Sequence, residues 1–144
     1  MVNQMYNKEV MKHFLNPRNM GEIKNPDAVG EVGNFKCGDV MKVYINVDKK
    51  SKDEKNSKIK DIKFQTFGCV AAIASTDIVC DIVKGKTIKE AKKLSKKDIL
   101  KKLGGLPGIK IHCSVLAEDA IKSAINDYRK KQGLEELIFD ASHV

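Results

Sequence analysis

Aromatic residues are scarce in this 144-residue sequence, which has no tryptophan and in which Phe, Tyr and Trp together make up 6%. Long apolar runs are also absent, since no stretch approaches the roughly 18 apolar residues of a membrane span. The N-terminal residues show no apolar stretch followed by a small-residue cleavage site. We therefore expect a globular protein of the cytoplasm, with no membrane association and no secretory signal.

Arginine is scarce as well, although the net charge is +8. Only Arg18 and Arg129 are arginines among the 27 basic residues, and the other 25 are lysines. Readout of base edges favours arginine, and binding of single strands adds interleaved aromatic residues. The composition thus argues against a nucleic-acid partner and favours a lysine-solvated surface, whose functional role would be attraction to an acidic partner protein.

Closely spaced cysteines are also absent. The four cysteines, Cys37, Cys69, Cys80 and Cys113, are separated by 32, 11 and 33 residues, and no CxxC pair occurs. This spacing excludes the zinc-ribbon, thioredoxin and bacterial ferredoxin patterns. Four cysteines are also too few for a disulfide scaffold of this length.

The first half of the chain has the pattern of an antiparallel sheet that follows one short helix over residues 6–14. Strands are predicted over residues 28–36, 40–48 and 58–67, with an irregularity near Asp61. Apolar and polar residues alternate in 40–48, as in a half-buried strand. A polar hairpin loop, residues 49–57, separates the last two segments, and such short connections imply antiparallel pairing.

The second half is predicted to be helical. An apolar helix spans residues 70–84 and ends at Gly85, and capping-box patterns at Thr87–Glu90 and Ser95–Asp98 each start a short lysine-rich helix. Apolar residues recur at helical spacing over 114–132. We expect an α+β fold in which a small antiparallel sheet of about three strands packs against several helices, including a long C-terminal one. One domain would cover residues 1–133, followed by a peripheral tail, residues 134–144.

Three of the cysteines share one kind of setting. Cys37 precedes Gly38 and Asp39, Cys69 lies between a strand and the helix 70–84, and Cys113 follows His112 directly before the helix 114–132. Unpaired N–H groups and the helix dipole at a helix N-terminus favour the thiolate, which is the metal-binding form of cysteine. The pattern predicts a metal or sulfur site, with zinc ahead of iron on spacing alone; three buried, inert cysteines are the alternative.

Cys80 is expected to be a core residue and not a ligand. Eleven residues of helix separate it from Cys69 by ~16 Å, whereas two ligands of one metal lie within ~4 Å of each other. His13 and His143 have no ligand-type neighbour in the sequence, so we expect structural or surface roles for them.

Four motifs of the chain resemble one known family over about residues 5–132. They are Asn16-Pro17-Arg18-Asn19, Cys37-Gly38-Asp39, Phe67-Gly68-Cys69 and Leu106-Pro107-Gly108-Ile109-Lys110-Ile111-His112-Cys113. The family is that of the iron–sulfur cluster assembly scaffolds, which comprises IscU and the N-terminal domain of NifU.

The resemblance implies a scaffold that is not an enzyme in the strict sense. Such proteins receive persulfide sulfur from a cysteine desulfurase, gather iron, build a [2Fe–2S] cluster and pass it to apo-acceptor proteins, with ferredoxin as a further partner. By match, Cys37, Cys69 and Cys113 would be the ligands, and Asp39 or His112 would be the fourth. Cys113 would accept persulfide, and Asp39 would assist release.

The same ligand set suits zinc in the purified protein. The alternative function is therefore a zinc-dependent sulfurtransferase of the Suf type. Because His112 is present, the resemblance favours the Isc/Nif type. A monomer and a dimer bridged by the cluster both fit it.

The partner loop, residues Leu106, Pro107, Gly108, Ile109 and Lys110, departs from the family, which usually has Leu-Pro-Pro-Val-Lys there. Glycine in place of the second proline loosens an extended, preordered segment. We therefore do not expect dependence on an Hsp70-type chaperone.

Overall fold

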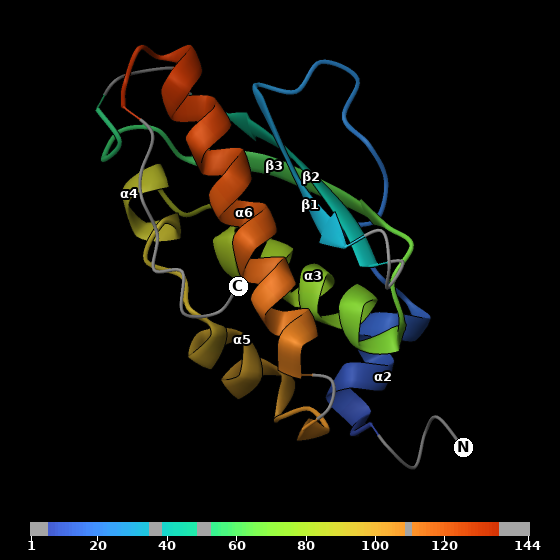
Figure 1. The fold of residues 1–144 in the computed structure, drawn as a ribbon. Coiled ribbons are helices and arrows are strands. Elements are labelled where there is room, and N and C mark those ends of the chain that lie inside the picture. Colours follow the sequence, from blue (N-terminus) through green and yellow to red (C-terminus); the bar gives the residue numbers. More distant parts are fainter. Residues whose placement is uncertain (1–5, 35–38, 49–52, 109–110, 136–144) are drawn as a thin grey trace.

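A computed structural model describes residues 6–34, 39–48, 53–108 and 111–135, and the fold below is that of these ranges (Figure 1). Helix α2 precedes a three-stranded sheet, and four helices follow it. The elements are α2 (Lys8–Leu15), β1 (Ala28–Asn34), β2 (Asp39–Val47), β3 (Ile59–Thr66), α3 (Val70–Val83), α4 (Ile88–Ala91), α5 (Lys96–Leu103) and α6 (Ile111–Lys131). The predicted α+β class, with about three strands and a long C-terminal helix, is confirmed.

The sheet has the order β1-β2-β3, and both pairings are antiparallel. Val43 of β2 lies opposite Gly30 of β1 and Phe64 of β3. The register shifts between Asn46 and Val47, opposite Asp61 and Ile59, which confirms the irregularity expected near Asp61. The alternating apolar residues of β2 are buried as predicted, and these are Met41, Val43, Ile45 and Val47.

Helices α3 and α6 cover one face of this sheet and pack against each other (Figure 1). Helix α6 crosses β1 so closely that a Cβ atom on Gly30 would lie 2.3 Å from the backbone nitrogen of Ala124. Only glycine leaves room for this contact between two backbones. Helix α3 is apolar around most of its circumference because α2, α5, α6 and the sheet surround it.

Local capping interactions set the ends of the short helices. Both predicted capping boxes form, at Thr87–Glu90 for α4 and at Ser95–Asp98 for α5. Gly85 and Gly104 have φ values of 84° and 75°, in the left-handed region that ends helices. In the described ranges, no helix combines the length and the apolar character that crossing a membrane requires.

One boundary differs from the prediction in a way that concerns the site. Helix α6 begins at Ile111, three residues earlier than the apolar periodicity indicated. Cys113 therefore lies inside the first helical turn and not directly before the helix. Cys113 already belongs to the hydrophobic core, whereas the apolar repeat in the sequence becomes visible only from Ala117. The start of a helix is set by caps and tertiary contacts that such a repeat does not contain.

Candidate functional site

The structure brings two of the predicted ligands together across 44 residues of sequence. The Sγ atoms of Cys69 and Cys113 are 3.8 Å apart. A disulfide would need about 2.05 Å. Two thiolates that bind the same tetrahedral metal, each at ~2.3 Å, have their sulfur atoms ~3.8 Å apart. The pair thus has the spacing of two ligands on one metal.

Both sulfurs lie at helix N-termini. Cys69 is the N-cap residue of α3, and its side chain makes no capping hydrogen bond. Cys113 is the third residue of α6. The positive ends of two helix dipoles therefore meet at the sulfur pair and favour its ionised form. Cys113 is buried whereas Cys69 is partly exposed, so a reactant can approach from the Cys69 side.

Hydrogen bonds attach the connection before Cys69 to the start of β2. The hydroxyl of Thr66 donates to the carbonyl oxygen of Val40 at 2.8 Å, and the backbone N–H of Gly68 donates to the Thr66 hydroxyl at 3.0 Å. Asp39, the first residue of β2, is paired in register with Asn34 of β1. The β3–α3 connection thus lies at the end of the sheet where β1 ends and β2 begins.

One predicted ligand cannot be placed from this structure, and for two others only the backbone can. Cys37 lies outside the described residues. The backbone of Asp39 begins β2, and that of His112 lies in the first turn of α6, but their side chains also lie outside what is described. The described geometry concerns Cys69 and Cys113, and the roles of the other three residues stay predictions.

Asn7 connects the start of α2 with the segment that leads to Cys113. Its Oδ1 accepts a hydrogen bond from the N–H of Val10 at 2.9 Å, which caps α2. Its Nδ2 donates to the carbonyl oxygens of Leu103 at 2.8 Å and Gly105 at 3.3 Å. One side chain therefore holds the α5 end against α2, directly before the partner loop. Of that loop, Leu106, Pro107 and Gly108 are described, and Ile109 and Lys110 are not.

Cys80 lies apart from this pair, as predicted. It is fully buried in α3. Burial raises the pKa of its thiol well above the ordinary value, and the charges of Asp77 and Asp81 raise it further. This thiol is therefore protonated at neutral pH and unsuited to bind metal.

His13, for which the sequence offered no partner, has one in the structure. Its Nδ1 lies 2.6 Å from Oδ2 of Asp77, and both side chains are buried. Asn19 donates to the same carboxylate from its backbone N–H at 3.0 Å and from its side chain at 3.1 Å. The signal in the sequence was Asp77 itself, since a carboxylate amid the apolar residues of a buried helix requires a partner.

The atoms of His13, Asp77 and Asp81 also lie within 4.8 Å of one another, a spacing that suits metal ligands. However, their polar atoms already have partners within the protein. Arg18 pairs with Asp81 at 2.8 Å, and Asn19 donates to both carboxylates. We interpret the group as a structural network between α2 and α3.

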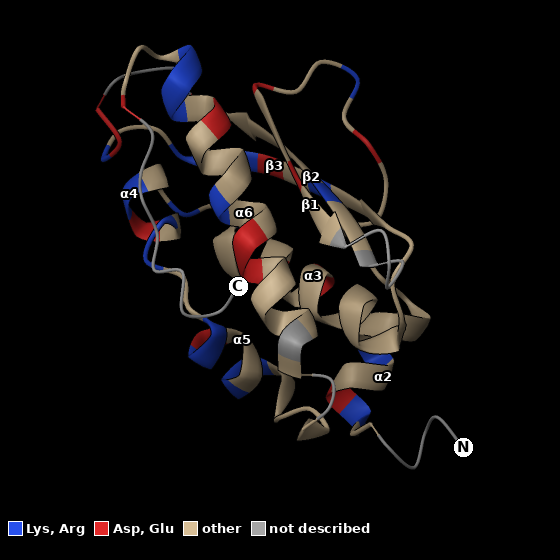
Figure 2. Cartoon of the chain, viewed as in Figure 1, with Lys and Arg blue, Asp and Glu red and all other residues tan. Residues whose placement is uncertain are grey.

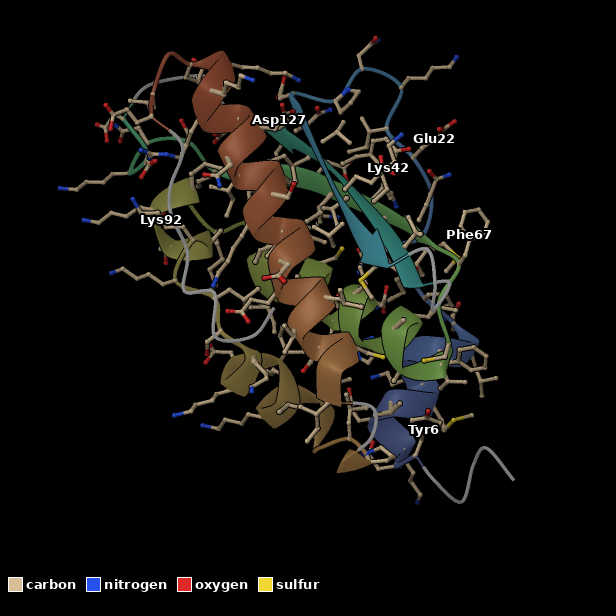
Figure 3. The ribbon with its side chains drawn as sticks, in the orientation of Figure 1. Tyr6, Glu22, Lys42, Phe67, Lys92 and Asp127 are labelled. Atoms are coloured by element: carbon tan, nitrogen blue, oxygen red, sulfur yellow. The ribbon has the colours of Figure 1, made fainter. Side chains whose placement is uncertain are left out.

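An exposed apolar surface borders the sulfur pair. Phe67, two residues before Cys69, is 88% exposed, and Figure 3 shows its ring pointing away from the body of the molecule. Met20 is 41% exposed, and both residues line a hollow of about 350 Å³ with Val40 and Lys42. Such a patch next to an accessible thiol suits contact with a partner protein.

Comparisons with known proteins identify the family of this chain. The model of the NifU-like N terminal domain matches residues 5–135. "Iron-sulfur cluster assembly scaffold protein IscU 1" of Archaeoglobus fulgidus is 51% identical over 129 residues, which cover 90% of this chain and 80% of that protein. "Iron-sulfur cluster assembly enzyme IscU" of Drosophila melanogaster is 50% identical over 131 residues, which cover 89% of this chain and 80% of that protein.

A solved structure supports the fold. A scaffold-protein candidate of the SUF iron–sulfur system from Fervidobacterium islandicum superposes with a TM-score of 0.68 at 24% identity, over 87% of this chain and 99% of that one. The family match spans nearly the whole sequence and includes Cys37, Cys69 and Cys113. This chain belongs to the NifU-like N-terminal domain family.

Proposed function

We propose that this protein is a scaffold on which an iron–sulfur cluster is assembled and from which it passes to apo-acceptor proteins. The observation that carries the proposal is the Cys69–Cys113 pair, with its Sγ atoms 3.8 Å apart at the N-termini of α3 and α6. Membership of a family whose relatives are named as scaffolds supports it. Cysteine thiolates are the usual ligands of iron–sulfur clusters.

The proposed cargo is a [2Fe–2S] cluster held by Cys37, Cys69 and Cys113, with Asp39 or His112 as the fourth ligand. Asp39 is the first residue of β2, beside the connection that carries Cys69, and Cys37 precedes it by two residues in the sequence. His112 directly precedes Cys113 in the first turn of α6. An oxygen or nitrogen ligand in place of a fourth thiolate makes the cluster easier to release, which suits a protein that must hand it on.

Cys113 is our choice for the sulfur acceptor. In that step the Cys113 thiolate attacks the outer sulfur of a persulfide on a cysteine desulfurase. A new S–S bond forms at Cys113, and the desulfurase cysteine leaves as a thiolate. Reduction of the delivered sulfur to sulfide requires an electron donor, for which we propose ferredoxin. The scaffold would turn over no substrate of its own, so we do not class it as an enzyme.

The proposed compartment is the cytoplasm, because a site of reduced thiolates needs a reducing environment. The partners would be the desulfurase, ferredoxin and apo iron–sulfur proteins. We expect a monomer or a dimer bridged by a cluster, no dependence on an Hsp70-type chaperone, and a domain boundary near residue 133.

Anaerobic reconstitution tests the proposal directly. Protein incubated with iron, cysteine and a desulfurase should develop the visible charge-transfer bands of a [2Fe–2S] cluster, with iron and sulfide in equal amounts. The cluster should then activate an apo-ferredoxin. Cys69→Ser and Cys113→Ser should each lose the bands.

Cys80→Ala is the matched control, because Cys80 is fully buried in α3 and its thiol is protonated at neutral pH. This variant should keep both the bands and the transfer. If the wild-type protein stays colourless, or if Cys113→Ser behaves like the wild type, the scaffold proposal is wrong.

The zinc-dependent sulfurtransferase remains the second candidate, because a separation of 3.8 Å between two sulfurs equally suits tetrahedral zinc. Asp39→Ala separates the two functions. In a scaffold, loss of this exchangeable ligand should slow transfer and trap the cluster. In a zinc enzyme, it should weaken zinc retention or sulfur transfer, and no variant should activate apo-ferredoxin.

A further inference from the structure

Nearly all of the net charge of the chain comes from one short stretch. Residues 84–102 contain nine lysines and two acidic residues, a net +7, whereas the whole chain has a net +8. The remaining 125 residues are thus nearly neutral. The stretch begins at the end of α3 and runs through α4 and α5, where Figure 2 shows the blue of lysine on both helices. We call the lysines of residues 84–102 the lysine face.

The two acidic residues of the stretch do not neutralise these lysines. Glu90 accepts a hydrogen bond from the N–H of Thr87 at 3.1 Å, and Asp98 accepts one from the N–H of Ser95 at 3.1 Å. Both carboxylates are thus directed at helix N-termini by the capping boxes.

Seven of the nine lysines have no ion pair within the described part of the chain. The exceptions are Lys84, whose Nζ is 4.0 Å from Asp61, and Lys92, whose Nζ is 2.5 Å from Glu54. The others are Lys86, Lys89, Lys93, Lys96, Lys97, Lys101 and Lys102.

Helix stability explains only part of this arrangement, because Lys101 and Lys102 lie in the last turn of α5, where positive charge is favourable, but the repulsion between lysines is not explained by it. Lys97 and Lys101 are four residues apart on α5, and like charges at this spacing destabilise a helix by about 0.2–0.5 kcal/mol. Ile99 and Leu103 anchor the opposite side of α5 in the core. Packing therefore holds the lysines in place although they repel one another, which indicates a role in recognition.

A groove gives the lysine face a definite centre. It has a volume of about 320 Å³ and lies between the end of α3 and the segment from α4 to α5. Ile82, Val83 and Leu94 supply its apolar lining, and Lys86 and Lys93 line it with exposed, positively charged side chains. Glu90 and Asp98 also line it, and their carboxylates accept the hydrogen bonds of the capping boxes. Its apolar lining suits an apolar side chain, and the lysines around it that have no ion pair in the described part of the chain suit flanking carboxylates.

We propose that this groove and the lysine face form a docking site for a carboxylate-rich segment of a partner protein. The residues from 84 to 102 include no arginine and no aromatic residue. Base readout favours arginine, and stacking on single strands requires aromatic rings. The chemistry therefore favours an acidic polypeptide over a nucleic acid.

The position of the groove separates this site from the sulfur pair. Ile82 is 13 residues beyond Cys69, so α3 places the two about 20 Å apart along its axis. A partner in the groove therefore leaves Cys69 accessible. The docking site does not depend on which metal or cluster the cysteines hold, so it can be tested in the reduced, metal-free protein.

The test measures the fluorescence anisotropy of a labelled, short glutamate-rich peptide with a central leucine. Lys86→Glu/Lys93→Glu should weaken binding about tenfold, since it removes two attractions and adds two repulsions. Lys60→Glu/Lys130→Glu changes the net charge equally at exposed positions of β3 and α6, and it should weaken binding less than about twofold. Replacing the leucine of the peptide with serine should also weaken binding.

Two results would overturn the proposal. An equal loss of affinity in both double variants would show that the peptide responds only to net charge. Tighter binding of an oligothymidylate of equal charge, lost in Lys86→Glu/Lys93→Glu, would identify a nucleic-acid surface instead. Lys86→Gln/Lys93→Gln, which adds no repulsion, should give an intermediate affinity, and circular dichroism confirms that each variant is folded.

Discussion

The Nδ1 atom of His13 lies 2.6 Å from Oδ2 of Asp77, and this contact joins two buried side chains that are 64 residues apart in sequence. It connects α2 with the middle of α3, the helix that begins at Cys69. The N-terminal helix is therefore part of the support of the sulfur pair. Loss of the contact between His13 and Asp77 should therefore lower the free energy of unfolding of the whole protein.

Asp77→Asn tests this support. The variant removes a buried charge that accepts hydrogen bonds from His13 and from Asn19, and such bonds contribute about 1.5–3 kcal/mol each. We expect the free energy of unfolding to fall by about 3 kcal/mol, as measured by urea denaturation. Asp81→Asn, at a partly exposed carboxylate, should cost less than half as much. Equal losses would contradict a special role for the buried pair.

Asn7 is predicted to couple α2 to the segment before Cys113. Asn7→Ala removes both the cap of α2 and the bonds to Leu103 and Gly105, and caps alone contribute about 1 kcal/mol. Asn7→Asp keeps the capping oxygen but has no Nδ2 donor.

Hydrogen exchange distinguishes the two roles of Asn7. Asn7→Asp should preserve amide protection in α2 and lower it around Gly105, whereas Asn7→Ala should lower it in both regions. Unchanged protection around Gly105 in both variants would refute the coupling.

Gly30→Ala should strongly destabilise the fold. The new Cβ would lie 2.3 Å from the nitrogen of Ala124 and 2.5 Å from the carbonyl oxygen of Ala120, so β1 and α6 would have to move apart. Overpacking of this kind costs about 3 kcal/mol. Gly108→Ala is the matched control, because nothing lies within 4 Å of its Cβ position. Thermal unfolding measures the melting temperature of each variant. An equal decrease in Gly30→Ala and Gly108→Ala would disprove the close contact.

Cys80 should react only when the protein unfolds. Its thiol is buried and its pKa is raised, mainly by burial, so iodoacetamide at neutral pH should modify the partly exposed Cys69 first. Peptide mass mapping measures the order of modification. Early labelling of Cys80 in folded protein would contradict its burial.

The raised pKa of Cys80 also predicts a dependence of stability on pH. Because the folded state holds the thiol proton more tightly than the unfolded state, the stabilising contribution is complete below the unfolded pKa of about 8.5. It is lost as the pH rises through the folded pKa. The difference in unfolding free energy between wild type and Cys80→Ala should therefore shrink in alkaline solution. A constant difference would count against the shift.

Features that depend on neighbouring residues were accessible from the sequence. Alternation predicted the buried face of β2, and the patterns Thr87–Glu90 and Ser95–Asp98 predicted the starts of α4 and α5. The rise of a helix excluded Cys80 from the ligand set. Each of these rests on hydrogen bonds or geometry within a few residues, which the order of amino acids determines.

Tertiary structure decided the contacts between distant segments. It set the separation of Cys69 and Cys113, gave His13 the partner Asp77, and extended α6 back to Ile111 so that Cys113 lies within a helical turn. Such contacts depend on how helices and sheet pack, and one-dimensional patterns contain no information on distance between segments. The sequence thus determined which residues have ligand chemistry, and packing decided that two of them lie at the separation of ligands on one metal.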